Sequence, residues 1–247
     1  MSEMNLCNWM AWAPGLETPE AWRQWALSGD AAPPSAAEIV LPPLKEIPPL
    51  LRRRAHAMGR AALHVLSRPE LPYRGQPIVL CSRFGEIQRS FELQHELARE
   101  NQVSPQQFSM SVHNATGGLF MMAQKANAPL TALSAGEEGA LAGLQEALAV
   151  LADGADSLWL LYCEEPLPGE SRPFFDDIMR ERDGHFAFLL ELAPGGEFRL
   201  TADGDRAASR TASPLELLAF FLRPEEDNIF LSPRGNWILR RTASRGS

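Results

Sequence analysis

The residues with the clearest chemical potential lie where a short apolar segment meets a long apolar run. Residues 129–134 end in Ser134, a tight Ala-Gly turn follows, and Glu137 and Glu138 precede the run. A strand, a sharp turn and a helix in this order is the arrangement that many enzymes use to present a nucleophile. Glu137 stands where a Cys or Ser would be expected. A carboxylate is stabilised at a helix N-terminus but is a poor acyl acceptor, so the sequence predicts a catalytic elbow that lacks its nucleophile.

Two catalytic alternatives use residues of this elbow. A serine hydrolase needs a Gly-x-Ser-x-Gly motif, and Ser134 lies in Leu-Ser-Ala instead. Glu137 and Glu138, with Glu164 and Glu165 at the next strand end, could act as general acid and base. Glutamates that begin a helix, however, more often only complement its dipole. A stand-alone acyltransferase or thioester hydrolase that uses Glu137 or Ser134 stays the alternative interpretation.

The sequence contains no ligand pattern for a metal or a nucleotide cofactor. Cys-x-x-Cys does not occur, and neither do GxGxxG or GxxxxGK[ST]. The five histidines have no regular spacing to cysteines or carboxylates; they are His56, His64, His95, His113 and His185. This distribution favours surface and packing roles, so we expect no metal site and no cofactor.

Charge and composition exclude several classes of partner. The net charge is −8 and the pI about 5.2, which argues against nucleic-acid binding, since phosphate recognition needs a basic surface. No segment approaches the roughly 20 apolar residues of a membrane helix, and the acidic N-terminus does not resemble a signal peptide. The three cysteines are widely spaced, which is typical of reduced thiols. We therefore expect a cytoplasmic protein that binds neither nucleic acid nor membrane.

A local basic patch interrupts this acidic chain. Arg52, Arg53 and Arg54 are consecutive, and Arg60 follows on the same predicted helix. Such a patch could receive an acidic partner such as a phosphopantetheine carrier. The solvated face of an amphipathic helix is the more common interpretation of the pattern.

The spacing of apolar residues predicts one α/β domain over residues 1–247 with a sheet covered on both faces. We expect a helix after Thr18 and Pro19, which fit an N-cap and N1 proline. The run that follows Glu137 is apolar almost all round and predicts a helix buried on most sides, as happens between two sheets. Irregular structure is expected at 31–49 and 101–110. Strands are expected at 6–12, 77–82, 129–134, 157–163, 186–192, 198–201, 229–231 and 237–240, and further helices at 51–66, 84–100, 111–125, 138–153 and 214–222.

Four segments in order carry a resemblance to a known family. They read Ser-Val-His-Asn-Ala-Thr-Gly-Gly at 111–118, Leu-Ser-Ala-Gly-Glu-Glu-Gly-Ala at 133–140, Ala-Asp-Gly-Ala-Asp-Ser-Leu-Trp-Leu-Leu at 152–161 and Tyr-Cys-Glu-Glu-Pro-Leu-Pro at 162–168. Together they resemble the N-terminal half of β-ketoacyl synthases, and most closely the short chain-length-factor proteins of aryl polyene-type fatty acid and polyketide clusters. In that alignment, counting back from the Asp-Gly turn at 153–154 places Glu137 at the nucleophilic cysteine.

The resemblance implies half of a thiolase-like fold, an N-terminal αβαβα-type layer with a mixed sheet and a buried central helix. It implies a non-catalytic subunit, because Glu137 replaces the thiolate and the half that carries the active-site histidines is absent. The implied partner is a catalytic β-ketoacyl-ACP synthase, with an acyl carrier protein as a further partner; a purely structural homodimer is another alternative. The implied pocket residues are Phe120, Met121 and Met122, and the implied interface residues are Pro129, Leu130, Thr131, Ala132, Leu133, Ser134, His113 and Asn114.

Overall fold

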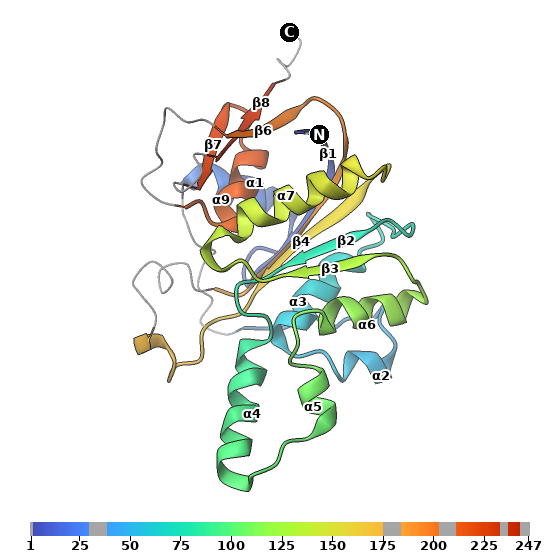
Figure 1. Cartoon of the computed structure of the whole chain (residues 1–247), viewed down its shortest axis with the longest axis vertical. Coiled ribbons are helices and arrows are strands. Elements are labelled where there is room, and N and C mark those ends of the chain that lie inside the picture. The colour runs from blue at the N-terminus through green and yellow to red at the C-terminus, as the bar shows by residue number, and fades with distance from the viewer. Residues whose placement is uncertain (1, 30–38, 175–183, 203–210, 233–236, 243–247) are drawn as a thin grey trace.

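The computed structural model describes residues 2–29, 39–174, 184–202, 211–232 and 237–242, and the described strands form one mixed eight-stranded sheet (Figure 1). The strand order is β3-β2-β4-β5-β1-β6-β8-β7, so β3 and β7 are the two edges. The strands are β1 (Glu3–Trp12), β2 (Ile78–Cys81), β3 (Leu130–Leu133), β4 (Leu158–Glu164), β5 (Phe186–Pro194), β6 (Phe198–Ala202), β7 (Asn228–Ser232) and β8 (Trp237–Arg241).

The helices fall on both faces of this sheet, as the sequence predicted. Helices α1, α7 and α9 pack on one face, and α3 and α6 on the other (Figure 1). The helices are α1 (Pro19–Ser28), α2 (Pro49–Arg52), α3 (Ala57–Leu66), α4 (Ile87–Glu100), α5 (Pro105–Ser109), α6 (Ala115–Gln124), α7 (Gly139–Ala152) and α9 (Pro214–Leu222), with short 3-10 turns η1 (Gly136–Glu138) and η2 (Arg172–Phe174).

Parallel pairing is confined to three strands. β2 runs parallel to both β3 and β4, whereas β5, β1, β6, β8 and β7 continue the sheet in antiparallel pairs. Every residue of β2 and β4 is buried, because strands of a parallel core are covered on both sides. Alternate residues serve the two faces: Val79 and Cys81 join the core under α7, and Ile78 and Leu80 join the core under α3 and α6.

Helix α7 confirms the predicted apolar central helix, but it does not lie between two sheets. The described residues contain a single sheet, and α7 packs on one face of it beside α9. Its apolar circumference is accommodated because the helix contacts strands β2, β3, β4, β5 and β7 as well as α9. Among the described residues, no helix has the length and apolarity that crossing a membrane requires.

Three local predictions need correction. The single helix expected at 51–66 is two helices, because residues 53–56 leave the helical path and His56 adopts an extended backbone at the N-cap of α3. The expected loop at 101–110 contains α5, which Ser104 caps by accepting from the Gln107 N–H. Helix α6 begins at Ala115 rather than at residue 111. Residues 39–48 are irregular as predicted, and residues 31–38 lie outside the described ranges.

Candidate functional site

The predicted elbow is present and its polar side chains are largely engaged. β3 ends at Leu133, η1 follows, and α7 begins at Gly139. The Ser134 hydroxyl donates to the carbonyl oxygen of Arg83 at 2.7 Å. The carboxylate of Glu138 accepts from the Ser232 hydroxyl at 2.7 Å. These two bonds tie the turn to the loop after β2 and to β7.

The elbow does not hold the geometry of a nucleophile and its base. Among the described residues, no histidine or carboxylate hydrogen-bonds to Ser134, and its hydroxyl proton is committed to a backbone carbonyl. Activation of a hydroxyl requires a base within hydrogen-bond reach. Glu137 is partly exposed on η1 and makes no hydrogen bond to another described residue. Of the four glutamates predicted as a possible acid and base, Glu138 is bound to Ser232 and Glu164 to Arg83, so these two have separate partners.

Strand β3 presents one side to β2 and the other to the outside of the sheet. The Ile78 N–H donates to the Pro129 carbonyl at 3.0 Å, and the Ser82 N–H donates to the Leu133 carbonyl at 3.1 Å. Because peptide groups alternate along a strand, those of Thr131 also face β2 and those of Leu130 and Ala132 face outward. No other described strand pairs with this outer side. It is therefore a free, four-residue sheet edge.

The predicted interface strand and the predicted pocket helix are in direct contact. A Cβ on Gly117 of α6 would lie 2.6 Å from Cδ2 of Leu130, so only glycine allows the helix to approach β3 this closely. His113 and Asn114 lie just before this helix, and Asn114 is its N-cap. Burial lowers the pKa of His113, whose ring lies against Gly85. The predicted set is thus brought together at one end of the sheet.

The three predicted pocket residues have different environments. Phe120 is fully buried, with its ring centroid 5.1 Å from that of Tyr73 and 6.0 Å from that of Trp159. The sulfur of Met121 accepts a weak hydrogen bond from the Tyr73 hydroxyl at 3.7 Å. Met122 is 51% exposed. Of the three, Met122 is the side chain that a partner can reach, and Phe120 belongs to the core.

The structure also assembles a buried polar cluster that lies beyond the elbow. Glu164 and Glu165 end β4 and are almost completely buried. Glu164 accepts from the Arg83 N–H at 2.7 Å, and its carboxylate lies 3.6 Å from the Arg83 side chain. Glu165 accepts from the backbone N–H groups of Met58 and Gln88 at 3.3 and 2.9 Å. This cluster joins the starts of α3 and α4 to the end of β4.

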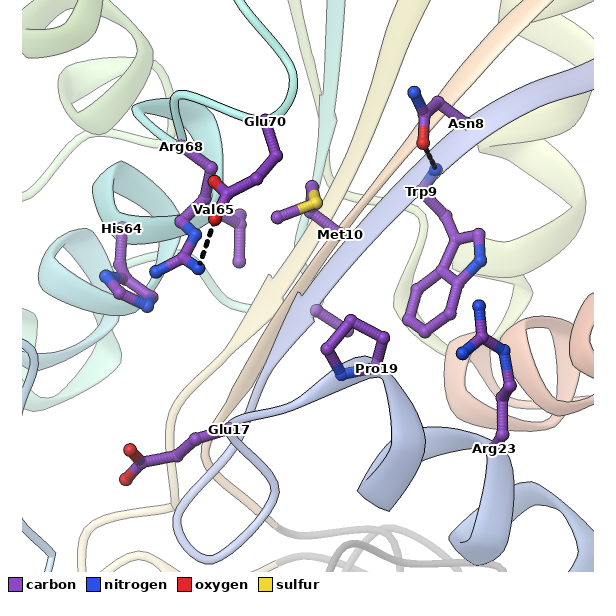
Figure 2. Close-up of a pocket in the computed structure, with 11 residues that line it drawn as sticks. Asn8, Trp9, Met10, Glu17, Pro19, Arg23, His64, Val65, Arg68 and Glu70 are labelled. Carbon is purple, nitrogen blue, oxygen red and sulfur yellow. Dashed lines mark hydrogen bonds and ion pairs between the residues drawn. The ribbon is translucent and has the colours of Figure 1, made fainter.

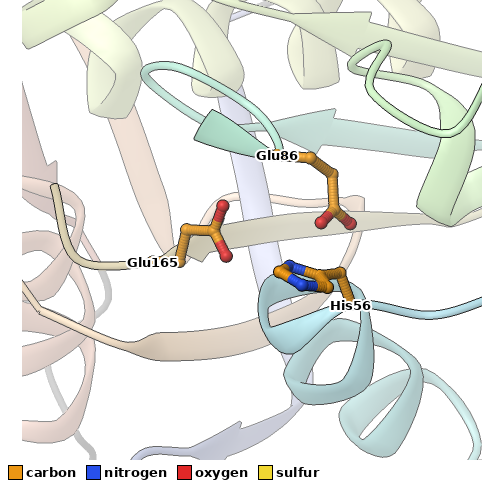
Figure 3. Close-up of side chains that lie close together, drawn as sticks. All are labelled: His56, Glu86 and Glu165. Carbon is orange, nitrogen blue, oxygen red and sulfur yellow. The ribbon is translucent and has the colours of Figure 1, made fainter. Parts of the chain in front are cut away.

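Two further side chains complete the cluster from other segments. Glu86, the residue before α4, is 2% exposed and accepts from the Thr116 hydroxyl at 3.0 Å. His56, the residue before α3, points at Glu86 and Glu165 (Figure 3). Burial raises the pKa of Glu86 and raises that of Glu165 to about 7, and it lowers the pKa of His56. These shifts show that the charged forms are costly where they lie.

Sequence reasoning found only part of this cluster. Ligand spacing in the sequence reveals only residues that are close along the chain, whereas His56, Glu86 and Glu165 come from three remote segments. The sequence places Glu164 and Glu165 at the end of an apolar strand, and in the structure Glu164 is the last residue of β4 and Glu165 the next. Nothing in the sequence around Glu86 distinguishes it from the surface glutamates of the helix that follows.

Two of the four arginines of the predicted basic patch bind backbone carbonyl oxygens. Arg52 donates to the Leu44 carbonyl at 3.4 Å and Arg60 to the Pro42 carbonyl at 2.8 Å, so both hold the irregular segment before α2 in place. A separate hollow of about 270 Å³ lies between β1, α1 and α3 (Figure 2). None of the residues predicted for the site lines this hollow, where Arg68 is paired with Glu70.

Comparison with known proteins agrees with the resemblance. The family model for the N-terminal domain of β-ketoacyl synthases matches residues 22–238. A search of curated proteins finds no match. Among solved structures, the chain is similar to one from the ketosynthase (ApeO) in complex with its chain length factor (ApeC) from Xenorhabdus doucetiae, with 26% identity, a TM-score of 0.82, and coverage of 98% of this chain and 100% of that one.

Two further solved structures are similar at lower identity and show the fold alone. The ishigamide ketosynthase/chain length factor matches with 13% identity and a TM-score of 0.62, over 82% of this chain and 68% of that chain. The complex of a type II polyketide synthase acyl-carrier protein with its ketosynthase, AntDE:AntF, matches with 13% identity and a TM-score of 0.60, over 83% and 70%. The thiolase-like α/β fold expected from the sequence is thereby confirmed.

Proposed function

The chain belongs to the family of β-ketoacyl synthase N-terminal domains, and we propose that it is a non-catalytic, chain-length-factor-like subunit of a catalytic β-ketoacyl-ACP synthase. In this proposal the two proteins form a heterodimer that works in polyene, fatty acid or polyketide-type biosynthesis. This chain contributes one wall of the pocket in which the partner's acyl chain grows.

The observation that carries the proposal is the free edge of β3. Leu130 and Ala132 direct their backbone groups outward, and an unpaired edge of this kind is a template for a strand from another chain. Pairing across a twofold or pseudo-twofold axis would extend one sheet through both subunits. The similar ApeO–ApeC structure is itself such a complex of a ketosynthase with its chain length factor.

Exposed apolar side chains lie on α5 and α6, and α6 packs against Leu130 of β3. Met122 on α6, Val112 just before it and Phe108 on α5 are each between 43% and 59% exposed. Contiguous apolar side chains at a surface mark contact sites more often than isolated ones do. We propose that Met122 faces the partner's acyl chain, with Met121 and the buried Phe120 supporting it from behind.

The elbow supports a non-catalytic role. Glu137 occupies the position that the family resemblance assigns to the nucleophilic cysteine, and the Ser134 hydroxyl is bound to a carbonyl oxygen. A condensing enzyme needs an acyl-holding thiolate and a site that stabilises the developing oxyanion. We propose that the partner supplies both, and that an acyl carrier protein delivers its cargo to the partner's site.

The test is co-expression with the ketosynthase encoded beside this protein. The proposal predicts a stable complex of the two chains, elongation of carrier-bound substrate by the complex, and no release of thiol from acyl-thioesters by this chain alone. Glu137→Ala should leave elongation by the complex within a few-fold of the unchanged protein. The thioesterase assay of the isolated chain uses both Glu137→Ala and Ser134→Ala. Thioesterase activity of the isolated chain that either substitution abolishes would favour the stand-alone enzyme, and a homodimer that ignores the ketosynthase would favour a structural role.

A further inference from the structure

The cluster of His56, Glu86 and Glu165 leaves buried polar atoms without partners. Oε2 of Glu86 and Nδ1 of His56 are both inaccessible to solvent and have no hydrogen-bond partner among the described residues. Glu86 is 2% exposed, so water does not compensate it. An unsatisfied buried carboxylate oxygen is costly and uncommon in folded proteins.

The three side chains lie close together in the fold. One ligand atom from each of the three residues lies within 4.8 Å of the others, and the side chains point toward one another (Figure 3). We propose that His56, Glu86 and Glu165 bind a divalent first-row transition-metal cation that joins the starts of α3 and α4 to the end of β4. The site is independent of the proposed partner.

The surroundings hold the ligands in orientations that suit a cation. The other oxygen of Glu86 accepts from Thr116 at 3.0 Å, and both oxygens of Glu165 accept from backbone N–H groups. Nε2 of His56 lies 3.9 Å from the carboxylate of Glu92, which leaves Nδ1 for the cluster. Metal-binding histidines commonly have a carboxylate beside the second ring nitrogen, and it fixes the orientation of the ring.

A glycine, Gly59, packs against Glu86 and Thr116 in this cluster. A Cβ on Gly59 would lie 2.9 Å from Oε1 of Glu86 and 2.9 Å from the Thr116 hydroxyl, so glycine is required beside them. The ligand atoms lie within 4.8 Å of one another, whereas the edge of a tetrahedral site with bonds of about 2.1 Å is roughly 3.4 Å. Small rotations of the side chains, with His56 the most accessible of the three, close that difference.

The charge balance also calls for a cation. Arg89 is the nearby positive residue, and its guanidinium donates to the carbonyl oxygen of Arg54 at 3.2 Å. It forms no ion pair within 4.0 Å with Glu86 or Glu165 in the described part of the chain. Burial raises the pKa of both carboxyl groups, and a bound cation would stabilise the charged forms that burial disfavours. One imidazole nitrogen with two carboxylates suits Zn²⁺ or Mn²⁺, whereas Mg²⁺ prefers an all-oxygen octahedral site.

The test uses the purified full chain, freed of metal by a chelator and titrated with Zn²⁺, Mn²⁺ or Mg²⁺ in a calorimeter. We expect one Zn²⁺ per chain with a dissociation constant in the micromolar range or below, weaker binding of Mn²⁺ and none of Mg²⁺. Glu86→Gln and His56→Gln should each weaken Zn²⁺ binding by at least about tenfold. Zn²⁺ should raise the melting temperature of the unchanged protein and not that of Glu86→Gln.

Two further measurements make the result decisive. His95→Gln is the matched control, because His95 is an exposed histidine paired with Glu170 at 3.0 Å and should bind Zn²⁺ only adventitiously. Metal-free Glu86→Gln should be at least as stable as the metal-free unchanged protein, since it replaces a buried carboxyl group, whose charged form burial disfavours, with a neutral amide of similar size. If Glu86→Gln does not fold, His56→Gln decides, because that side chain is 35% exposed. No stoichiometric binding, or binding that only His95→Gln abolishes, overturns the proposal.

Discussion

Replacement of Ala132 by proline tests whether a partner strand pairs with the β3 edge, because it removes one backbone hydrogen-bond donor. The Ala132 N–H faces away from β2, because the carbonyls of Pro129 and Leu133 accept from β2 and the peptide groups alternate. Proline removes that N–H and is tolerated at a sheet edge when the missing donor faces outward. The isolated protein should therefore unfold within about 3 °C of its unchanged melting temperature.

The effect on the complex can be estimated from the lost pairing. If the partner's strand pairs with β3, the substitution leaves one of its carbonyl oxygens unpaired in a covered interface. Such a loss costs about 1–3 kcal/mol, and the proline ring adds a steric penalty at the same position. We expect about 1.5–3 kcal/mol in total, which weakens the dissociation constant roughly 10- to 140-fold. Sedimentation or titration of the two purified proteins measures it directly.

Two control variants, one at the same residue and one at its neighbour, separate the loss of main-chain pairing from a general loss of stability. Ala132→Ser keeps the N–H and nearly the same volume, so it should bind the ketosynthase as the unchanged protein does. Thr131→Pro removes a donor that faces β2 and should destabilise the isolated protein itself. Unchanged affinity for Ala132→Pro, in a protein with normal stability, would refute pairing through β3.

Three further predictions concern the pocket helix and the core. Met122→Ala should lengthen the products of the complex and Met122→Trp should shorten them, and neither should change stability because the side chain is 51% exposed. Phe120→Ala should instead lower the free energy of unfolding, measured by urea titration, by about 3–5 kcal/mol. Burial lowers the pKa of His185 to about 4, so between pH 6.5 and 4 the unfolded chain binds a proton that the native state does not. The free energy of unfolding should therefore fall by up to about 3 kcal/mol as the pH drops through that window, and the difference between the unchanged protein and His185→Asn should isolate this contribution. Tyr162→Phe removes the hydroxyl that donates to the Ala140 carbonyl at 2.8 Å in the core, and equilibrium unfolding should show a loss of about 1–3 kcal/mol.

The parts of the fold that the sequence predicted well are those where local pattern and burial agree. β4 is apolar from Leu158 to Cys163 because it lies between its parallel neighbour β2 and its antiparallel neighbour β5, under helices on both faces. Thr18 accepts from the Ala21 N–H as an N-cap should, and proline follows it. Strand apolarity and helix caps depend on a few consecutive residues, so they can be predicted from the sequence alone.

The parts that the sequence could not predict depend on contacts between remote segments. The break at 53–56 is invisible to periodicity, because Leu51 and Met58 stay on the same side whether or not the helix is continuous. Its cause is the extended backbone of His56, which turns the ring toward Glu86 and Glu165. These carboxylates lie 30 and 109 residues further along the chain, and only the folded sheet reveals that the three are neighbours.

The proposed function gives the elbow a structural role. A catalytic turn must leave its nucleophile accessible and within hydrogen-bond reach of a base. Here the Ser134 hydroxyl is bound to Arg83 and the Glu138 carboxylate to Ser232, so the turn fastens the loop after β2 and strand β7 to the start of α7. Because both bonds hold the turn, the position of the C-terminal end of β3 is fixed. Under the proposed function, that rigidity is what the elbow contributes, because a partner strand can pair only with an edge whose path is fixed in advance.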